Sequence, residues 1–217
     1  MLDNINNDVY IGQYYSISTM VCLGDIMKMK KKENIVEMAR SLFTRFGFNK
    51  TTVDEIARDS YVAKSTIYNH FNSKEEIFEQ VIEKEASILF NEINTALENI
   101  SDPFEKLRTY AITRMRHVKK LINLYSALND EYLEHFEFIE KARKKSLEKE
   151  IKMIKSIFQE GIDQGVFEVL DLNLISFSII TSWKGLDFPW TKDIDLPDPL
   201  ENINYLLDVL FNGIRKR

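Results

Sequence analysis

The residues best suited to binding chemistry form a short polar row in the first third of the chain. Its members carry hydrogen-bond donors and lie close together: Lys64, Ser65, Thr66, Tyr68, Asn69 and His70. Side chains of these types reach phosphates and base edges when a helix enters the major groove of DNA. Lys64, Ser65 and Asn69 are the best candidates for contacts with bases. The row therefore predicts a surface that binds nucleic acid.

Two short helices around a tight turn are needed to present this row. Thr52 can cap the first helix, and Glu55 can reach back to complete a capping box. The apolar positions of that helix share one side: Val53, Ile56 and Ala57. Ile67 and Phe71 are four residues apart and give the second helix a buried stripe. Residues 52–71 therefore predict a helix-turn-helix.

Motifs on both sides of this segment extend the pattern. They are the runs Leu42-Phe43-Thr44-Arg45-Phe46-Gly47-Phe48, Thr51-Thr52-Val53, Ile56-Ala57 and Tyr68-Asn69-His70-Phe71-Asn72-Ser73-Lys74-Glu75-Glu76-Ile77-Phe78. With these motifs, residues 31 to about 85 resemble the TetR/AcrR family of bacterial repressors. The resemblance implies that Tyr68, His70 and Lys74 contact phosphates, while Thr52 caps the helix before them. It also implies a dimer that reads a palindromic DNA operator and responds to a small-molecule effector.

Two positions depart from the family pattern. Tyr61 stands in the turn where the family usually has Gly, and a Tyr at positive φ would be strained. Ala63 replaces the Ser or Thr that usually caps the recognition helix, at a cost of about 1 kcal/mol of local stability. Both departures bear on the geometry of the helix that would read DNA.

Composition and capping signals predict an all-α fold of about nine helices. The chain has 217 residues, of which 44% are hydrophobic and only seven are Gly and four Pro. A first helix is expected to open at Lys28, to carry an apolar stripe that includes Phe43 and Phe46, and to end at Gly47. Further helices are expected to start after three capping residues: Ser73, Asp102 and Asp198.

These signals divide the chain into three parts. Residues 28–75 form a three-helix DNA-binding head, and residues 76–217 form a helical domain for ligand binding and dimerisation. Residues 1–27 show no helical period, and we interpret them as a disordered arm or as a start site placed too early. A minor-groove arm is the alternative, although it would need Arg or Lys, and residues 1–27 contain neither.

The charge distribution agrees with a DNA-binding head. The net charge of the chain is −5, but residues 28–75 hold ten Lys or Arg against six Asp or Glu. One Cys excludes an internal disulfide framework, and no apolar stretch or leader pattern predicts a membrane span or secretion. We expect a cytoplasmic protein with no membrane partner.

Two helices near the C-terminus are apolar on more than one face. They span about residues 171–187 and 199–214, and each needs a second partner in addition to its own core. We expect the same pair of helices from a second subunit to be that partner, which predicts a homodimer. 

Aromatic and methionine side chains in the body could line an effector pocket, although most such residues are core or dimer contacts. The candidates are Met115, Tyr125, Tyr132, Phe136, Phe177, Trp183 and Phe188. This aromatic content suggests an apolar or planar effector, and the acidic body gives some weight to a cationic one.

No enzyme motif, metal motif or cofactor motif is visible. A cluster of possible ligands, Asp130, Glu131, Glu134 and His135, lacks the duplicated spacing of a di-iron bundle and is expected to be a solvated helix face. We therefore expect no catalytic residues, no metal and no cofactor. The alternative to a DNA-binding regulator is a helical small-molecule-binding or protein-interaction module that has lost operator reading.

Overall fold

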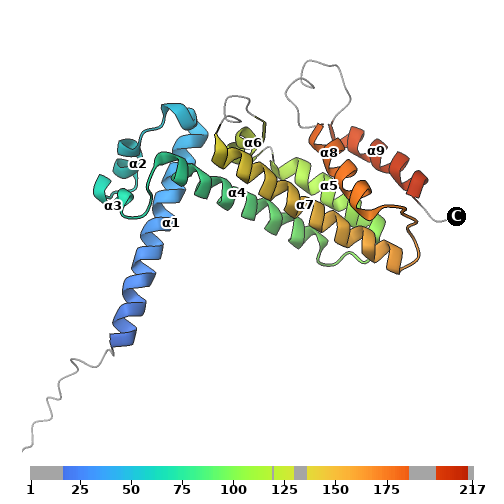
Figure 1. The fold of residues 1–217 in the computed structure, drawn as a ribbon, viewed down its shortest axis with the longest axis horizontal. Helices are drawn as coiled ribbons and strands as arrows, with labels where there is room; N and C mark the ends of the chain where they lie inside the picture. Colours follow the sequence, from blue (N-terminus) through green and yellow to red (C-terminus); the bar gives the residue numbers. More distant parts are fainter. Residues whose placement is uncertain (1–16, 119, 130–135, 186–198, 215–217) are drawn as a thin grey trace, which may run out of the picture.

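The computed structural model describes residues 17–118, 120–129, 136–185 and 199–214. Within these ranges the chain forms nine helices and no β-sheet (Figure 1). They are α1 (Ile17–Lys50), α2 (Val53–Asp59), α3 (Lys64–Tyr68), α4 (Lys74–Leu97), α5 (Pro103–Val118), α6 (Ile122–Asn129), α7 (Glu137–Asp163), α8 (Leu172–Gly185) and α9 (Pro199–Ile214). The predicted all-α fold is confirmed. No helix in the described ranges has the length and apolar content of a membrane span.

The head consists of α1, α2 and α3 at one end of the molecule, and α4 leads from it into the body (Figure 1). Its core contains side chains from each of these helices. Among those that are almost fully buried are Ile35, Ala39, Ile56, Ile67, Phe71, Ile77 and Phe78. Burial of these apolar groups is the main stabilising term for so short a three-helix unit.

The end of α1 differs from the predicted stripe at one aromatic position. Phe46 is 46% exposed, whereas Phe48 is buried and its ring centroid lies 4.9 Å from that of Phe78. Gly47 lies between them with φ 80°, a conformation that glycine adopts without strain. The expectation that Phe46 is buried is therefore wrong, because the kink at Gly47 turns Phe48 into the core instead.

The beginning of α1 also differs from the prediction. The helix starts at Ile17 rather than at Lys28, so residues 17–27 are not the disordered segment that we expected. This part of α1 extends away from the head (Figure 1), and Ile26 and Met27 are exposed on it. No proline interrupts residues 17–50, and Met, Leu and Lys are good helix formers, so nothing in the sequence stops the helix at Lys28.

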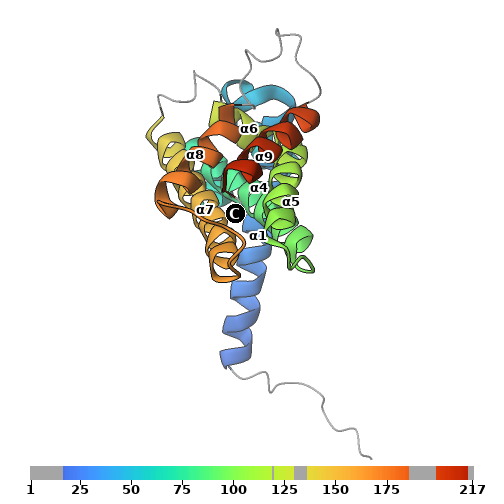
Figure 2. The same ribbon diagram turned by 90° about the vertical axis from the view of Figure 1, so that its right-hand side faces the viewer.

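The body is a bundle in which α5 packs against α4, α7 and α9, while α8 packs against α7 (Figure 2). Two of the predicted starts are confirmed: Ser73 Oγ accepts the backbone N–H of Glu76, and Asp102 Oδ1 accepts that of Phe104. Asp198 lies outside the described residues. The side chain of Glu76 does not return to Ser73 but accepts the N–H of Asn72 at 2.7 Å. The side chains of Ser73 and Glu76 therefore each accept one backbone N–H at the start of α4.

A buried carboxylate connects the head to the body. Glu85 on α4 is only 1% exposed, and its Oε1 accepts hydrogen bonds from Arg40 Nε (3.0 Å) and Asn123 Nδ2 (2.8 Å). Its Oε2 accepts the backbone N–H of Leu124 at 2.8 Å. Since Arg40 belongs to α1 and the other two donors to α6, one side chain joins three helices.

A second buried carboxylate lies deeper in the body. Glu150 on α7 is 1% exposed and accepts a hydrogen bond from Arg114 Nε at 2.6 Å. Tyr110 Oη and Ser146 Oγ also donate to it, at 3.4 Å and 3.3 Å. Burial, and then the Glu150 charge, raise the pKa of Tyr110 well above its ordinary value. The sequence pattern had not indicated this buried ion pair.

Candidate nucleic-acid interface

The first helix of the predicted helix-turn-helix starts with a complete capping box. Thr52 Oγ1 accepts the backbone N–H of Glu55 at 3.3 Å, and Glu55 Oε2 accepts the backbone N–H of Thr52 at 2.8 Å. These bonds lower the pKa of the Glu55 carboxyl. The predicted capping role of Thr52 is confirmed, and it fixes where α2 begins.

The turn between α2 and α3 is a Schellman motif with an unusual residue in it. The N–H of Val62 donates to the carbonyl of Ala57 at 3.0 Å, and the N–H of Tyr61 to that of Arg58 at 3.1 Å. Tyr61 occupies the position that is usually Gly, with φ 56°, and its side chain is 95% exposed. A non-glycine residue in this region costs about 1–2 kcal/mol. The predicted strain at Tyr61 is therefore present.

Helix α3 begins without a side-chain cap. Ala63 is the N-cap residue and makes no such hydrogen bond, as its sequence position predicted. Lys64 Nζ is instead paired with Asp54 Oδ2 at 2.9 Å, which connects the starts of α3 and α2. The two side chains are 50% and 69% exposed, so the pair adds little stability.

The predicted polar row lies on the outer side of α3. Ile67 and Phe71 are each 1% exposed and anchor the helix to the head. The side chains of Lys64, Ser65, Tyr68 and Asn69 are exposed, and those of Thr66 and His70 are partly buried. The structure thus brings all six residues together on a single short helix and its C-terminal end.

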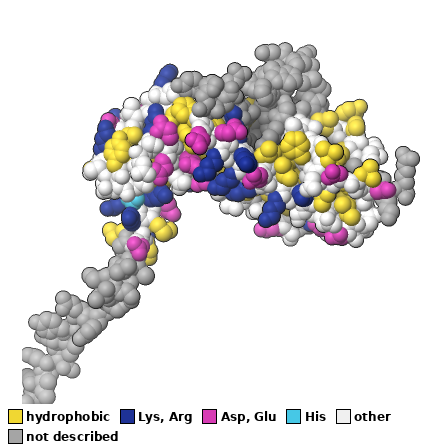
Figure 3. All heavy atoms as spheres, viewed as in Figure 1, with side chains coloured by type: hydrophobic (Ala, Val, Ile, Leu, Met, Phe, Trp, Pro, Cys, Tyr) yellow, Lys and Arg dark blue, Asp and Glu magenta, His cyan; other side chains and the backbone are white. Residues whose placement is uncertain are grey.

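Lysines from α1 lie beside the same surface. Burial, followed by the positive charges of Lys28, Lys32 and Lys31, lowers the pKa of His70. Lys32 Nζ also lies 5.3 Å from the centroid of the Phe71 ring. Figure 3 shows blue side chains around a histidine below the head. The sequence alone left open whether these lysines contact phosphate or form a solvated helix start, and the fold places them next to His70.

Lys74 has a structural role that the sequence did not show. Its ammonium group donates to the carbonyls of Phe48 (2.9 Å) and Thr51 (3.1 Å) and lies 4.3 Å from the centroid of the Phe48 ring. The kink after Gly47 leaves these carbonyls without helical partners, so a cation there satisfies them. An ammonium group has three donors, and one remains for a phosphate. The phosphate contact of Lys74 stays a prediction.

The predicted pocket residues of the body that the structure describes lie on α5, α6 and α8 and just before α7. Met115 and Trp183 are buried, and the Trp183 ring stacks on Tyr110 with centroids 5.6 Å apart. Phe136 packs against Phe48 near the head, and Phe177 is 48% exposed on α8. Tyr125 is partly buried on α6. Tyr132 and Phe188 lie outside the described residues, as does the acidic cluster Asp130, Glu131, Glu134 and His135.

Comparisons with known proteins agree with this geometry. Residues 35–81, which span α2, α3 and parts of α1 and α4, match the family model described as bacterial regulatory proteins, tetR family. The chain is 29% identical over 167 residues to the HTH-type transcriptional regulator YhgD of Bacillus subtilis, covering 76% of this chain and 87% of that protein. It is also 29% identical over 160 residues to the HTH-type transcriptional repressor KstR2 of Mycolicibacterium smegmatis, covering 70% and 76% of the two chains.

A solved structure extends the similarity to the body. The crystal structure of a transcriptional regulator from Cytophaga hutchinsonii superposes with a TM-score of 0.70 at 26% identity, covering 85% of this chain and 98% of that one. The family model matches the head, and the relatives and the solved structure extend the similarity into the body. The head of the chain is thus similar to the tetR family of bacterial regulatory proteins, and most of the chain is similar to HTH-type transcriptional regulators.

Proposed function

We propose that this protein is a DNA-binding transcriptional repressor that a small-molecule effector releases from a palindromic operator. One observation carries the proposal: α3 is anchored by Ile67 and Phe71 and presents its remaining side chains as an exposed row of donors. The lysines of α1 add positive charge beside that row. This combination supports base contacts from α3 and phosphate contacts from its surroundings.

Dimerisation through α8 and α9 would place two such heads on one duplex. Apolar side chains project from both helices: Leu174, Phe177, Tyr205, Leu206 and Val209 are between 39% and 71% exposed. A symmetric interface between two copies would cover them. Two recognition helices about 34–36 Å apart would then enter successive major grooves of the operator. Such a role requires access to chromosomal DNA and fits the expected cytoplasmic location.

The proposal is tested by titrating the protein onto DNA that flanks its own gene. We expect sequence-specific binding by a dimer, with an affinity that falls steeply as salt rises, because phosphate contacts displace counterions. Fluorescence anisotropy measures the affinity, and sedimentation gives the mass of the complex. A chain that stays monomeric and does not bind this DNA at low salt would instead support the protein-interaction or small-molecule-binding alternative.

Substitutions separate base contacts from other roles. Lys64→Ala should weaken binding to the operator by about 1–3 kcal/mol and reduce discrimination against non-specific DNA. Lys74→Ala should weaken binding to all sequences alike and also lower the thermal stability of the head, because it removes two bonds to carbonyl groups. Lys144→Ala is the control, since Lys144 is an exposed lysine of α7 in the body. Equal loss of discrimination in all three variants would contradict the assignment of Lys64.

A further inference from the structure

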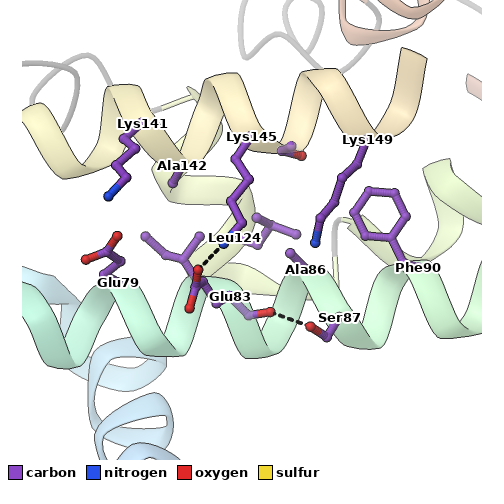
Figure 4. Close-up of a pocket in the computed structure, with 12 residues that line it drawn as sticks. Glu79, Glu83, Ala86, Ser87, Phe90, Leu124, Lys141, Ala142, Lys145 and Lys149 are labelled. Carbon is purple, nitrogen blue, oxygen red and sulfur yellow. Dashed lines mark hydrogen bonds and ion pairs between the residues drawn. The ribbon is translucent and has the colours of Figure 1, made fainter. Parts of the chain in front are cut away.

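A groove between α4 and α7 combines an apolar floor with a row of lysines (Figure 4). Its volume is about 250 Å³, and Ile82, Ala86 and Leu124 contribute apolar surface to it. Lys141, Lys145 and Lys149 recur every four residues and therefore share one face of α7. Figure 4 shows these three lysines pointing from α7 toward α4. The groove is thus amphipathic, with positive charge along one wall.

Among the described residues, carboxylates lie near the lysines at one end of the groove only. Lys145 is paired with Glu83 of α4, and Glu79 lies on the same side of the groove (Figure 4). At the other end, Lys149 Nζ lies 5.4 Å from the Phe90 ring centroid, and no carboxylate partner of Lys149 is found in the described part of the chain. The positive charge near Lys149 is therefore available to a ligand.

The groove continues past Lys149 into a second hollow of about 480 Å³. Ser87, Phe90 and Lys149 line both parts, which makes them continuous. Lys152 and Met153 belong to the second hollow, and no Asp or Glu is among its described lining residues. Two lysines beside neutral polar and apolar groups form a local positive field on a body whose overall charge is negative. The local field opposes the expectation of a cationic effector.

We propose that this groove binds an anionic, amphipathic small molecule. Its negative group lies between Lys149 and Lys152, and its apolar part passes Phe90 to cover the floor at Ala86 and Leu124. Charge-assisted hydrogen bonds would hold the anion, and removal of apolar surface from water would hold the tail. This inference rests on the proposed function and specifies where the effector binds and what its chemical class is.

The position of the groove connects such a ligand to the head. Leu124 lines the floor, and its backbone N–H is held by Glu85, which also accepts a hydrogen bond from Arg40 on α1. Helix α4 forms one side of the groove and begins directly after the recognition helix. A ligand that binds more tightly to one arrangement of α4 and α7 than to another would therefore shift the population of head positions.

The test uses the full-length protein and three eight-carbon probes whose polar groups differ in charge. Octanoate is anionic, octan-1-ol is neutral and octylammonium is cationic. Isothermal titration calorimetry should show octanoate binding at least about tenfold more tightly than either of the others, because only the carboxylate can pair a negative charge with the two lysines. Lys149→Gln should weaken octanoate binding about tenfold. Lys144→Gln should leave it unchanged, because Lys144 lies on α7 but not along the groove.

Three outcomes would overturn the inference: no octanoate binding, equal binding of the three probes, or equal octanoate affinity of Lys149→Gln and the unmodified protein. Lys149 is exposed, so its substitution is not expected to affect folding, and a thermal unfolding curve checks this. The DNA titration is run in parallel. If the protein binds its operator but fails these tests, only this inference is wrong. If it binds octanoate through Lys149 but does not bind DNA, the proposed function is wrong.

Discussion

The head and the body differ in how they use polar side chains. In the head, two polar pairs of the helix-turn-helix are close in sequence and exposed: Thr52 with Glu55 and Lys64 with Asp54. In the body, the principal ion pair is distant in sequence and buried: Arg114 and Glu150 have side chains that are 3% and 2% exposed. Exposed pairs contribute little stability and can exchange partners, whereas a buried pair is costly to break. The comparison indicates that the exposed pairs of the head can exchange partners, whereas the buried pair of the body stabilises the fold.

The largest effect is expected from breaking the buried pair. Glu150→Gln would remove the negative charge from the buried ion pair with Arg114 and should lower the free energy of unfolding by about 3–5 kcal/mol. Urea denaturation followed by circular dichroism measures the loss. Glu148→Gln, an exposed position on the same helix, should change stability by less than about 0.5 kcal/mol. If both variants lost the same amount, the proposed contrast between buried and exposed charge would be wrong.

An intermediate effect is expected in the turn of the head. Tyr61→Gly should raise the free energy of unfolding of the head by about 1 kcal/mol, because glycine adopts φ 56° without strain. Tyr61→Ala keeps a Cβ atom and should gain much less, which makes it the matched control. Ala63→Ser should add about 1 kcal/mol by capping α3. Thermal unfolding measures all three, and a gain in Tyr61→Ala equal to that in Tyr61→Gly would argue against backbone strain.

The smallest effect concerns His70 and pH. Its pKa in the free protein is lowered from 6.5 by burial and by the lysines of α1. The contribution of neutral His70 to the free energy of unfolding is therefore fully present above pH 6.5, the ordinary pKa value in the unfolded state. It is lost as the pH falls through the lower pKa of the folded state. A phosphate beside His70 would favour the protonated form and raise its pKa, so operator binding should take up a proton.

Operator affinity should therefore increase as the pH is lowered from about 7.5 to about 6, by at most about tenfold per pH unit for one proton. Anisotropy titrations at several pH values measure this dependence. His70→Gln should remove it while keeping a side chain that can hydrogen-bond. A pH dependence that persists in His70→Gln would assign the proton to another group.

The same contrast explains what the sequence could and could not predict. The cap at Thr52, the strain at Tyr61 and the missing cap at Ala63 were predictable, because each depends on residues a few positions away. The roles of Glu85 and Glu150 were not, because their arginine partners are 45 and 36 positions away and an isolated Glu in a helix resembles a solvated one.

Two features of the head were missed for different reasons. The early start of α1 was missed because residues 17–27 lack an amphipathic period, although nothing in them prevents a helix. The carbonyl contacts of Lys74 were missed because they depend on how the chain turns after Gly47, which is tertiary geometry that local patterns do not contain.

Helix α4 has a mechanical consequence for operator choice. It runs without interruption through 24 residues from the head into the body, a length of about 36 Å. A tilt of about 5° at its distal end would displace the head by about 3 Å over this length. Two heads moved in this way would fit operators whose half-sites are spaced slightly differently. Changes remote from the duplex could thus alter which spacer lengths the protein accepts, even when every base contact is retained.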